Sequence, residues 1–550
     1  MSSALGANQD FDDPVDIFDL PMNQRVIGYF LSRQARLLGN RQFLTIDGQS
    51  YSFAEVDRRT RAVASGLAAK GVGEGDRVLV MLPNCAEFIF TWFGLSLVGA
   101  AICPVNTQLK GDLLDYRITN AQASGIIVDA EYFQVVESIS PAARASLAWI
   151  CLRPTPGHGE PARTSADFNF GELYVTDGPD PEIDRDHNRI QLIGYTSGTT
   201  GPSKGVMMPS SHCFALSCNL ARVVGLTADD VIYSPLPLYH QMSTFMATLP
   251  ALTAGARVVI GDHFSASRYF AESAQHDATI GIVVHALVPF IKSTPPSEAD
   301  RAHRVRALFN AGHDLEFEER FGVHLVEAFA LTETGYLLYT RYPERRIGST
   351  GLAHEDWEIQ LVDDNDNPVP RGQAGELIAR PRKPGIMLRG YLNNSDATVA
   401  ASRNLWWHTG DILRQDDDGY FYFVDRKKDR IRRRGQNIAS AEVEQAVLGH
   451  PAVAECAAVP FPIRETDDEV RIIVVLRPGE PLAAPTLYAW LGERLPRYMV
   501  PRFIEFVDAL PRTGTGKLQK PVLVQQGLGE SAWDAEFVNE SGTRSLTAHE

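Results

Sequence analysis

The residues with the clearest chemistry form a loop rich in glycine and hydroxyl side chains. The eleven residues Tyr195–Gly205 read YTSGTTGPSKG. Glycine lets successive backbone N–H groups face one anion, hydroxyls add donors, and a lysine adds positive charge. These properties suit a polyphosphate, although surface turns share this composition. The spacing excludes a Walker A loop, and the candidate phosphate-binding residues are Thr196, Ser197, Gly198, Thr199, Thr200 and Lys204.

Apolar segments flank this loop, Ile190–Tyr195 before it and Val206–Met208 after it. We expect both to be strands, so that the loop joins two strands and does not open a helix. Lysine positions add information because the chain has 9 lysines against 43 arginines. Five of the lysines fall in segments with motif-like composition, namely Lys204, Lys427, Lys428, Lys517 and Lys520.

Together with further motifs, the loop resembles the acyl-adenylate-forming superfamily of acyl-CoA synthetases, peptide-synthetase adenylation domains and beetle luciferases. The resemblance covers about residues 25–525 and depends on the order of the motifs more than on any one of them. The other matching segments are PLPLYH (Pro235–His240), FNAGHDL (Phe309–Leu315), EAFALTETG (Glu327–Gly335), HTGD (His408–Asp411) and PRTGTGK (Pro511–Lys517).

The resemblance implies a role for each segment in activating a carboxylate with ATP and Mg²⁺. Thr332 would contact the α-phosphate, Glu333 would act as a metal ligand, and His240 would lie at the mouth of the acyl pocket. Lys517 would bridge the carboxylate and the α-phosphate, because both reactants are anions and need positive charge. The implied nucleotide contacts are Gly312, His313, Phe329, Ala330, Asp411, Phe423 and Arg426, with Asp411 accepting both ribose hydroxyls.

Within the superfamily, Phe421–Glu444 most resembles CoA ligases of the crotonobetaine/carnitine-CoA ligase type, and Pro295–Arg306 supports the same branch. This implies a hinge at Lys428, on which a small domain rotates after adenylation and exchanges Lys517 for a thiolation face. CoA contacts are expected at Arg433, Arg434 and Gly435 because arginines bind phosphates, although a basic run can also be a solvated linker.

Several positions depart from the family pattern. Phe329-Ala330 replaces the usual Tyr-Gly pair, and Gly312-His313-Asp314 stands where small residues are usual. Gln436 and Ala439 replace the usual glutamate and serine after the basic run. Because these changes cluster around the adenine, the α-phosphate and the thiolation loop, an enzyme that takes a preformed acyl-adenylate is an alternative.

The overall composition limits the classes of function. The chain has 550 residues, of which 44% are hydrophobic, and this is typical of a globular protein of two or more domains. A net charge of −16 argues against a general nucleic-acid binder. Six scattered cysteines and a polar N-terminus without signal-peptide features predict a reduced, cytoplasmic protein. The uncharged stretch Phe88–Val105 contains glycine and proline, which favours a buried helix and strand over a membrane span.

Apolar strand-like runs alternate with helical patterns from about residue 50 to 400, with helices expected at Phe53–Ala69 and Ala86–Val98. This predicts an α/β fold with a large, multi-sheet N-terminal domain whose sheets are largely parallel. Enrichment in Gly, Pro and Asp over 343–425 predicts a small β-barrel or β-subdomain. The expected domains are 1–427, a small mobile α+β domain over 428–528, and a flexible tail over 529–550.

We therefore expect an acyl-CoA ligase that converts a carboxylic acid and ATP into acyl-AMP, and then uses CoA to form acyl-CoA and AMP. Three alternatives remain open: a half-reaction enzyme that transfers a preformed acyl-adenylate to CoA, an adenylation domain that loads a carrier protein, and a non-catalytic relative. Retention of Lys204, Glu333, Asp411 and Lys517 counts against the last of these. The sequence identifies neither the acid nor the oligomeric state.

Overall fold

The computed structural model describes residues 20–155, 165–177, 183–196, 203–284, 287–309, 312–427, 431–433, 436–438, 440–464, 467–495, 497–512, 516 and 518–536. These residues form two compact units. The first comprises the described parts of Met1–Thr196, Ser203–Glu358 and Pro381–Ala400, and the second those of Ile359–Arg380 and Ala401–Glu550. The predicted domains 1–427, 428–528 and 529–550 divide the chain differently and stay a prediction.

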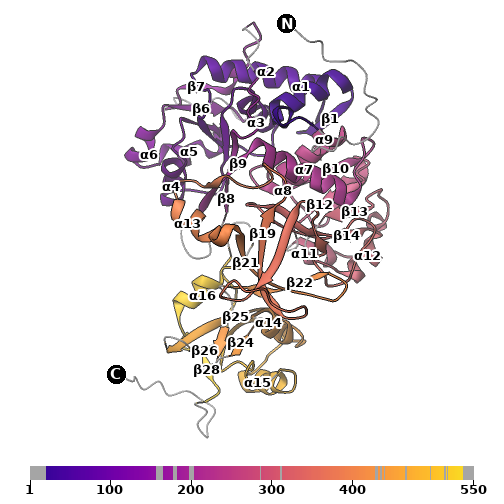
Figure 1. Cartoon of the computed structure of the whole chain (residues 1–550), viewed down its shortest axis with the longest axis vertical. Helices are drawn as coiled ribbons and strands as arrows, with labels where there is room; N and C mark the ends of the chain where they lie inside the picture. Colours follow the sequence, from indigo (N-terminus) through magenta and orange to yellow (C-terminus); the bar gives the residue numbers. More distant parts are fainter. Residues whose placement is uncertain are drawn as a thin grey trace. The chain divides into compact units, whose positions relative to one another are not determined.

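An eight-stranded sheet in the first unit positions the candidate phosphate loop. Its order is β20-β9-β8-β4-β3-β5-β6-β7, and the pairs from β8 through β7 are parallel. Figure 1 labels β6, β7, β8 and β9 of this sheet. At one edge the pairs β8–β9 and β9–β20 are antiparallel. The strands are β3 (Arg77–Met81), β4 (Ala101–Pro104), β5 (Gly125–Asp129), β6 (Trp149–Arg153), β7 (Phe168–Asn169), β8 (Ile190–Thr196), β9 (Lys204–Pro209) and β20 (Gly390–Tyr391).

A second, seven-stranded sheet of the first unit has the order β14-β13-β12-β10-β11-β1-β2, and all its pairs except β1–β2 are parallel. Its strands are β1 (Gln42–Ile46), β2 (Gln49–Ser52), β10 (Val231–Ser234), β11 (Arg257–Ile260), β12 (Ile280–Ile282), β13 (Ala307–Phe309) and β14 (His324–Val326). A three-stranded sheet follows, made of β15 (Ala328–Leu331), β16 (Gly335–Tyr339) and β17 (Leu352–Ala353).

The helices of the first unit begin where local chemistry favours them. The hydroxyl of Ser52 accepts the N–H of Glu55 while the Glu55 carboxylate accepts the N–H of Ser52, a reciprocal cap that starts α2. The helices are α1 (Ile27–Leu38), α2 (Phe53–Ala69), α3 (Ala86–Leu97), α4 (Asp112–Ala121), α5 (Phe133–Glu137), α6 (Pro141–Ser146), α7 (Ser210–Val224), α8 (Gln241–Ser243), α9 (Leu249–Ala254), α10 (Tyr269–Gln275), α11 (Val288–Lys292), α12 (Leu315–Phe321) and α13 (Ser395–Ala401).

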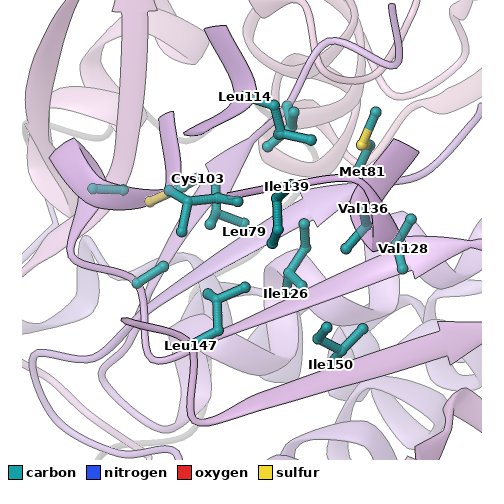
Figure 2. Close-up of a cluster of buried hydrophobic side chains, with 14 of the residues drawn as sticks. Leu79, Met81, Cys103, Leu114, Ile126, Val128, Val136, Ile139, Leu147 and Ile150 are labelled. Carbon is teal, nitrogen blue, oxygen red and sulfur yellow. The ribbon is translucent and has the colours of Figure 1, made fainter. Parts of the chain in front are cut away.

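A hydrophobic core lies against one face of the eight-stranded sheet. Alternate residues of β3 and β5, such as Leu79 and Ile126, meet apolar side chains of α4 and α5, such as Leu114 and Val136 (Figure 2). The intervening residues of β3 are buried too, so this strand is apolar on both faces. Burial on both faces explains why the parallel strands are continuous apolar runs in the sequence.

The second unit begins with a four-stranded sheet of order β18-β19-β21-β22, apart from the strand ends that belong to the first unit. Its strands are β18 (Trp357–Val362), β19 (Ala374–Pro381), β21 (Trp407–Gln415) and β22 (Phe421–Arg426). The remaining elements are β23 (Ile431–Arg433), β24 (Gln436–Ile438), α14 (Ser440–Leu448), β25 (Val453–Arg464), β26 (Asp467–Leu476), α15 (Ala484–Gly492), β27 (Phe503–Phe506), α16 (Lys520–Gln526) and β28 (Trp533–Asp534).

The α/β fold with largely parallel sheets is confirmed, and α2 has the predicted bounds. The uncharged stretch Phe88–Val105 is the rest of α3 followed by β4, as expected. Within the described ranges, no helix combines the length and the apolarity that crossing a membrane requires. All six cysteines are buried as thiols.

Candidate active site

The hairpin of β8 and β9 places two predicted phosphate-binding residues opposite each other. Its antiparallel register pairs Thr196 with Lys204, and both residues are half-buried. The expectation that the loop joins two strands is therefore confirmed. The remaining members of the predicted loop, Ser197, Gly198, Thr199 and Thr200, lie outside the described residues.

Lys204 and Glu333 meet through Tyr391, a residue that the sequence analysis did not select. The Lys204 ammonium nitrogen lies 4.8 Å from the centre of the Tyr391 ring. The Tyr391 hydroxyl donates a hydrogen bond of 2.8 Å to Oε1 of Glu333. Tyr391 reaches this position because β20 pairs with β9, where Tyr391 lies opposite Val206. A predicted phosphate-binding cation and a predicted metal ligand thus share one tyrosine.

Thr332 has a side-chain partner on α8. Its hydroxyl donates a hydrogen bond of 2.9 Å to Oε1 of Gln241. Gln241 follows His240, whose Nδ1 accepts the backbone N–H of Met242 at 3.2 Å and so caps α8. Because Nδ1 is an acceptor, a neutral His240 carries its proton on Nε2. The two predicted catalytic residues Thr332 and His240 are therefore linked through Gln241.

The backbone around Thr332 is fixed by a buried histidine of α7. The ring nitrogens of His212 lie 2.9 Å from the carbonyl oxygens of Thr332 and Ile386. Burial lowers the pKa of His212 to about 4, although both carbonyls favour the protonated ring. His212 thus ties the turn that carries Thr332 and Glu333 to the segment that precedes Tyr391.

One predicted adenine residue, His313, belongs to a second polar pair. Nε2 of His313 lies 3.0 Å from Oε2 of Glu327 and 3.3 Å from the carbonyl of Ser349. The hydrogen bond with Glu327 raises the pKa of His313 against the opposing effect of burial. Glu327 precedes β15, the strand that carries Phe329, which is half-buried, and Ala330, which is exposed.

Gly312 precedes this pair and has a φ of +124°, a backbone conformation that favours glycine.

The first unit contains all the described residues predicted for the phosphates, the metal, the acyl pocket and adenine. They are Thr196, Lys204, His240, Gly312, His313, Phe329, Ala330, Thr332 and Glu333.

The predicted ribose residues belong to the second unit. Asp411 in β21 and Arg426 in β22 are paired in the strand register, and Nε of Arg426 lies 3.2 Å from Oδ1 of Asp411. The Asp411 side chain is 3% exposed, whereas that of Arg426 is 48% exposed. Phe423, on the same strand, is an exposed aromatic residue. The three residues thus offer a carboxylate, a cation and an aromatic face on neighbouring strands.

Glu376 of β19 supports the turn before Asp411. Its carboxylate accepts the N–H of Gly410 at 3.1 Å and a hydrogen bond of 3.0 Å from Nζ of Lys427. Burial would raise the pKa of Glu376, but Lys427 and His408 hold it below its ordinary value. A negative charge therefore remains beside the predicted ribose site.

Arg433, predicted to contact CoA, lies in a different environment. It is buried, with Nη2 2.5 Å from Oε2 of Glu469 and Nη1 donating to the carbonyls of Tyr498 and Val500. A contact with CoA would require these bonds to open, so that role stays a prediction. Lys428, Arg434, Gly435 and Lys517 lie outside the described residues.

Sequence reasoning gave no individual role to Gln241, Tyr391, His212 or Glu327, although Glu327 lies in the matching segment EAFALTETG. Gln241 and Thr332 are 91 positions apart, and Tyr391 and Glu333 are 58 apart. Only adjacency to a chosen residue could have indicated Gln241, which follows His240. Tyr391 carried no local signal, because its position depends on the pairing of β20 with β9.

The site fits a magnesium ion that is held mainly by substrate. Within the described residues, no cluster of three or more His, Cys, Asp and Glu side chains could hold a metal. Oε2 of Glu333 has no hydrogen-bond partner in the described part of the chain, so it is available to a cation. Mg²⁺ is commonly bound by one or two carboxylates together with substrate phosphates and water.

Comparison with known proteins places this geometry in a family. The AMP-binding enzyme family matches residues 31–392, and the AMP-binding enzyme C-terminal domain matches residues 442–517. Crotonobetaine/carnitine–CoA ligases of Salmonella paratyphi A and Salmonella typhi are each 29% identical over 484 residues, covering 86% of this chain and 92% of the relative.

Solved structures share the fold. The anthranilate CoA ligase AuaEII in complex with anthranoyl-AMP has a TM-score of 0.81 at 24% identity, covering 93% of this chain and 99% of that chain. ATP-bound MatB from Rhodopseudomonas palustris has a TM-score of 0.80 at 24% identity, covering 91% and 98%. The protein belongs to the AMP-binding enzyme family and is an AMP-forming ligase of the acyl-CoA synthetase type.

Proposed function

We propose that this enzyme activates a carboxylic acid with ATP and transfers the resulting acyl group to CoA. In the first step a carboxylate oxygen bonds to the α-phosphorus, and the bond from that phosphorus to pyrophosphate breaks. In the second step the CoA sulfur bonds to the acyl carbon, and AMP leaves. The names of its relatives support CoA as the acceptor, since the Salmonella proteins are CoA ligases.

The observation that carries the proposal is the contact chain from Lys204 through Tyr391 to Glu333, next to Thr332. A cation, a carboxylate and a hydroxyl at one place supply the parts that transfer of an adenylyl group needs. Lys204 would neutralise the β- and γ-phosphates, and Thr332 would donate to the α-phosphate. Glu333 would hold Mg²⁺, which offsets the charge of the phosphates when bound.

The residues proposed to hold the nucleoside belong to the second unit. Asp411 would accept both ribose hydroxyls, Arg426 would add a further contact, and Phe423 would cover an apolar face of the nucleoside. Lys517 would bridge the carboxylate and the α-phosphate in the first step only, and a rotation at Lys428 would withdraw it before CoA reacts. Holding the reactants in line accounts for much of the acceleration such enzymes need.

The test is acid-dependent exchange of pyrophosphate into ATP with a panel of carboxylic acids, followed by acyl-CoA formation. Lys204→Ala and Glu333→Gln should each lower exchange by about 10²-fold, because each removes charge stabilisation from the transition state. Lys70→Ala is the matched control, since Lys70 pairs with Glu172, which is not a predicted site residue.

The alternatives are separate outcomes of the same test. Absence of exchange, with acyl-CoA formed from synthetic acyl-AMP, would replace the proposal by the half-reaction enzyme. Exchange without acyl-CoA formation would favour a carrier protein as the acceptor. Absence of both activities would contradict the proposal altogether.

A further inference from the structure

The side chain of Gln241 accepts the hydrogen bond of the Thr332 hydroxyl, and Gln241 belongs to none of the matching sequence segments. Oε1 of Gln241 lies 2.9 Å from Oγ1 of Thr332 and accepts the only hydroxyl proton. Gln241 is the first residue of α8 and is half-buried. The contact joins the acyl side of the site, where His240 lies, to the residue predicted to bind the α-phosphate.

The other end of the carboxamide is poorly satisfied. Among the described residues, Nε2 donates to the sulfur of Met208 at 3.9 Å, and a thioether accepts weakly. Gly194 of β8 lies so close that a Cβ there would come within 2.4 Å of Nε2. The carboxamide therefore lies between β8 and Thr332, and the described residues offer its two N–H groups no strong acceptor.

This arrangement conflicts with the role of Thr332 in adenylation. A phosphate oxygen only accepts hydrogen bonds, and a threonine hydroxyl has one proton to donate. While Gln241 accepts that proton, Thr332 cannot give it to the α-phosphate. Rotation of the carboxamide by about 180° around the Cγ–Cδ bond of Gln241 removes the conflict. Nε2 then donates to Oγ1 of Thr332, and the hydroxyl proton becomes available to the phosphate.

We propose that Gln241 is a positioning residue whose carboxamide turns over when ATP binds, which switches the Thr332 hydroxyl from Gln241 to the α-phosphate. The inference rests on the proposed function, since it concerns the adenylation step. In the turned state Gln241 donates to Thr332 and Thr332 donates to the phosphate, forming a directed chain of two hydrogen bonds. A Cβ at position 194 would clash with Nε2 of Gln241, so a larger residue there would obstruct the carboxamide.

The decisive variant is Gln241→Glu, which keeps the shape but only accepts hydrogen bonds when ionised. It should hold the Thr332 proton and lower pyrophosphate exchange by roughly 10²-fold at about pH 8. Gln241→Met removes both functions of the carboxamide and should cost about 10-fold at every pH, because the hydroxyl merely loses its orientation. At about pH 8, Gln241→Glu is thus expected to exchange pyrophosphate more slowly than Gln241→Met.

A pH series separates this inference from a packing role. Protonated glutamate can donate to Thr332, so the rate of Gln241→Glu relative to wild type should rise several-fold between about pH 8 and about pH 5.5. The relative rate of Gln241→Met should stay flat. Dividing each variant's exchange rate by the wild-type rate at the same pH cancels the effects of neighbouring ionisable groups that all the proteins share. These groups are His212, His240, Glu333 and Lys204.

Two further comparisons complete the test. Acyl-CoA formation from a supplied acyl-adenylate should be nearly unchanged in both variants, because that step does not attack the α-phosphate. Gly194→Ala should push the carboxamide aside without changing its chemistry, and it should reproduce the pH-independent loss of Gln241→Met. In a Thr332→Val background, Gln241→Met should cost nothing more.

Equal losses for the glutamate and methionine variants at every pH would overturn the inference and leave the ligase assignment intact. The same holds if both variants match wild type or if both half-reactions fall together. If wild-type protein neither exchanges pyrophosphate with any acid nor binds Mg·ATP by calorimetry, the proposed function fails and this inference fails with it.

Discussion

At the scale of single residues, the site depends on side chains that hold other side chains. Tyr391 holds Glu333, Gln241 holds Thr332, and Glu327 holds His313. The first two supports come from segments 58 and 91 positions away, and sequence spacing alone cannot predict such pairs. The motif residues Lys204, Thr332 and Glu333 could be predicted because their types and order are informative by themselves.

Tyr391→Phe tests the support of Glu333. The variant keeps the ring beneath Lys204 and removes the hydroxyl that donates to the carboxylate. A hydrogen bond to a charged group contributes about 1.5–3 kcal/mol, so adenylation at limiting Mg²⁺ should fall about 10-fold or more. The measurement is pyrophosphate exchange as a function of Mg²⁺ concentration.

Tyr339→Phe is the matched control, because the Tyr339 hydroxyl donates to Glu355 at the same distance of 2.8 Å away from the motif residues. It should leave the Mg²⁺ dependence unchanged. If the Tyr391→Phe enzyme showed the same Mg²⁺ dependence as wild type, the Tyr391 hydroxyl would have no role in supporting Glu333 as a metal ligand.

The pair of His313 and Glu327 predicts a pH dependence of stability. The pKa of His313 is raised in the folded protein, so the folded state binds the proton more tightly than the unfolded state. Its contribution is complete below about pH 6.5, the ordinary value for histidine, and is lost as pH rises through the raised pKa.

Urea unfolding of wild type and His313→Gln at a pH below and a pH above this range checks the sign. The free energy of unfolding should differ more between the two proteins at the acidic pH. A difference in unfolding free energy that is larger at the alkaline pH would contradict a raised pKa of His313 in the folded protein.

At the scale of elements, the sequence predicted types well and ends less well. The reciprocal cap of Ser52 and Glu55 makes the start of α2 predictable from the sequence, and the apolar face of the helix indicates how far it continues. By contrast, composition does not indicate where β25 ends, because the strand continues through two prolines to Arg464. Proline usually ends a strand, but β25 is at an edge of its sheet, where a missing N–H costs little.

Ser52→Ala tests the cap of α2. Loss of the capping hydroxyl should lower the free energy of unfolding by about 1 kcal/mol, because an N–H at the helix start loses its acceptor. Chemical denaturation measures it. Ser65→Ala, within the same helix, is the control and should change stability less. Equal effects of both substitutions would mean that the cap does not stabilise the helix.

At the scale of the whole molecule, the residues predicted to contact the nucleotide are divided between the two units. The first contains the phosphate, metal and adenine residues, and the second contains Asp411 and Arg426. The α/β class and the order of the motifs could be predicted from sequence. The division of the chain could not, because the second unit combines segments that lie on either side of Pro381–Ala400.

Asp411→Asn tests the contribution of the second unit. The carboxylate is proposed to accept two ribose hydroxyls, so its loss should weaken AMP binding about 10-fold or more by calorimetry. Asp534→Asn is the matched control, since Asp534 is paired with Arg502 in the same unit at 3.0 Å. Unchanged AMP affinity in Asp411→Asn would exclude Asp411 from the nucleotide site.

The central claim is that a carboxylate attacks the α-phosphate of ATP before CoA reacts. Turnover of a carboxylic acid labelled with ¹⁸O in both oxygens, with ATP and CoA, tests it by mass spectrometry of the products. The account predicts one ¹⁸O atom in AMP and one in the acyl group of acyl-CoA, with none in pyrophosphate. Unlabelled AMP, or ¹⁸O in pyrophosphate or inorganic phosphate, would contradict it.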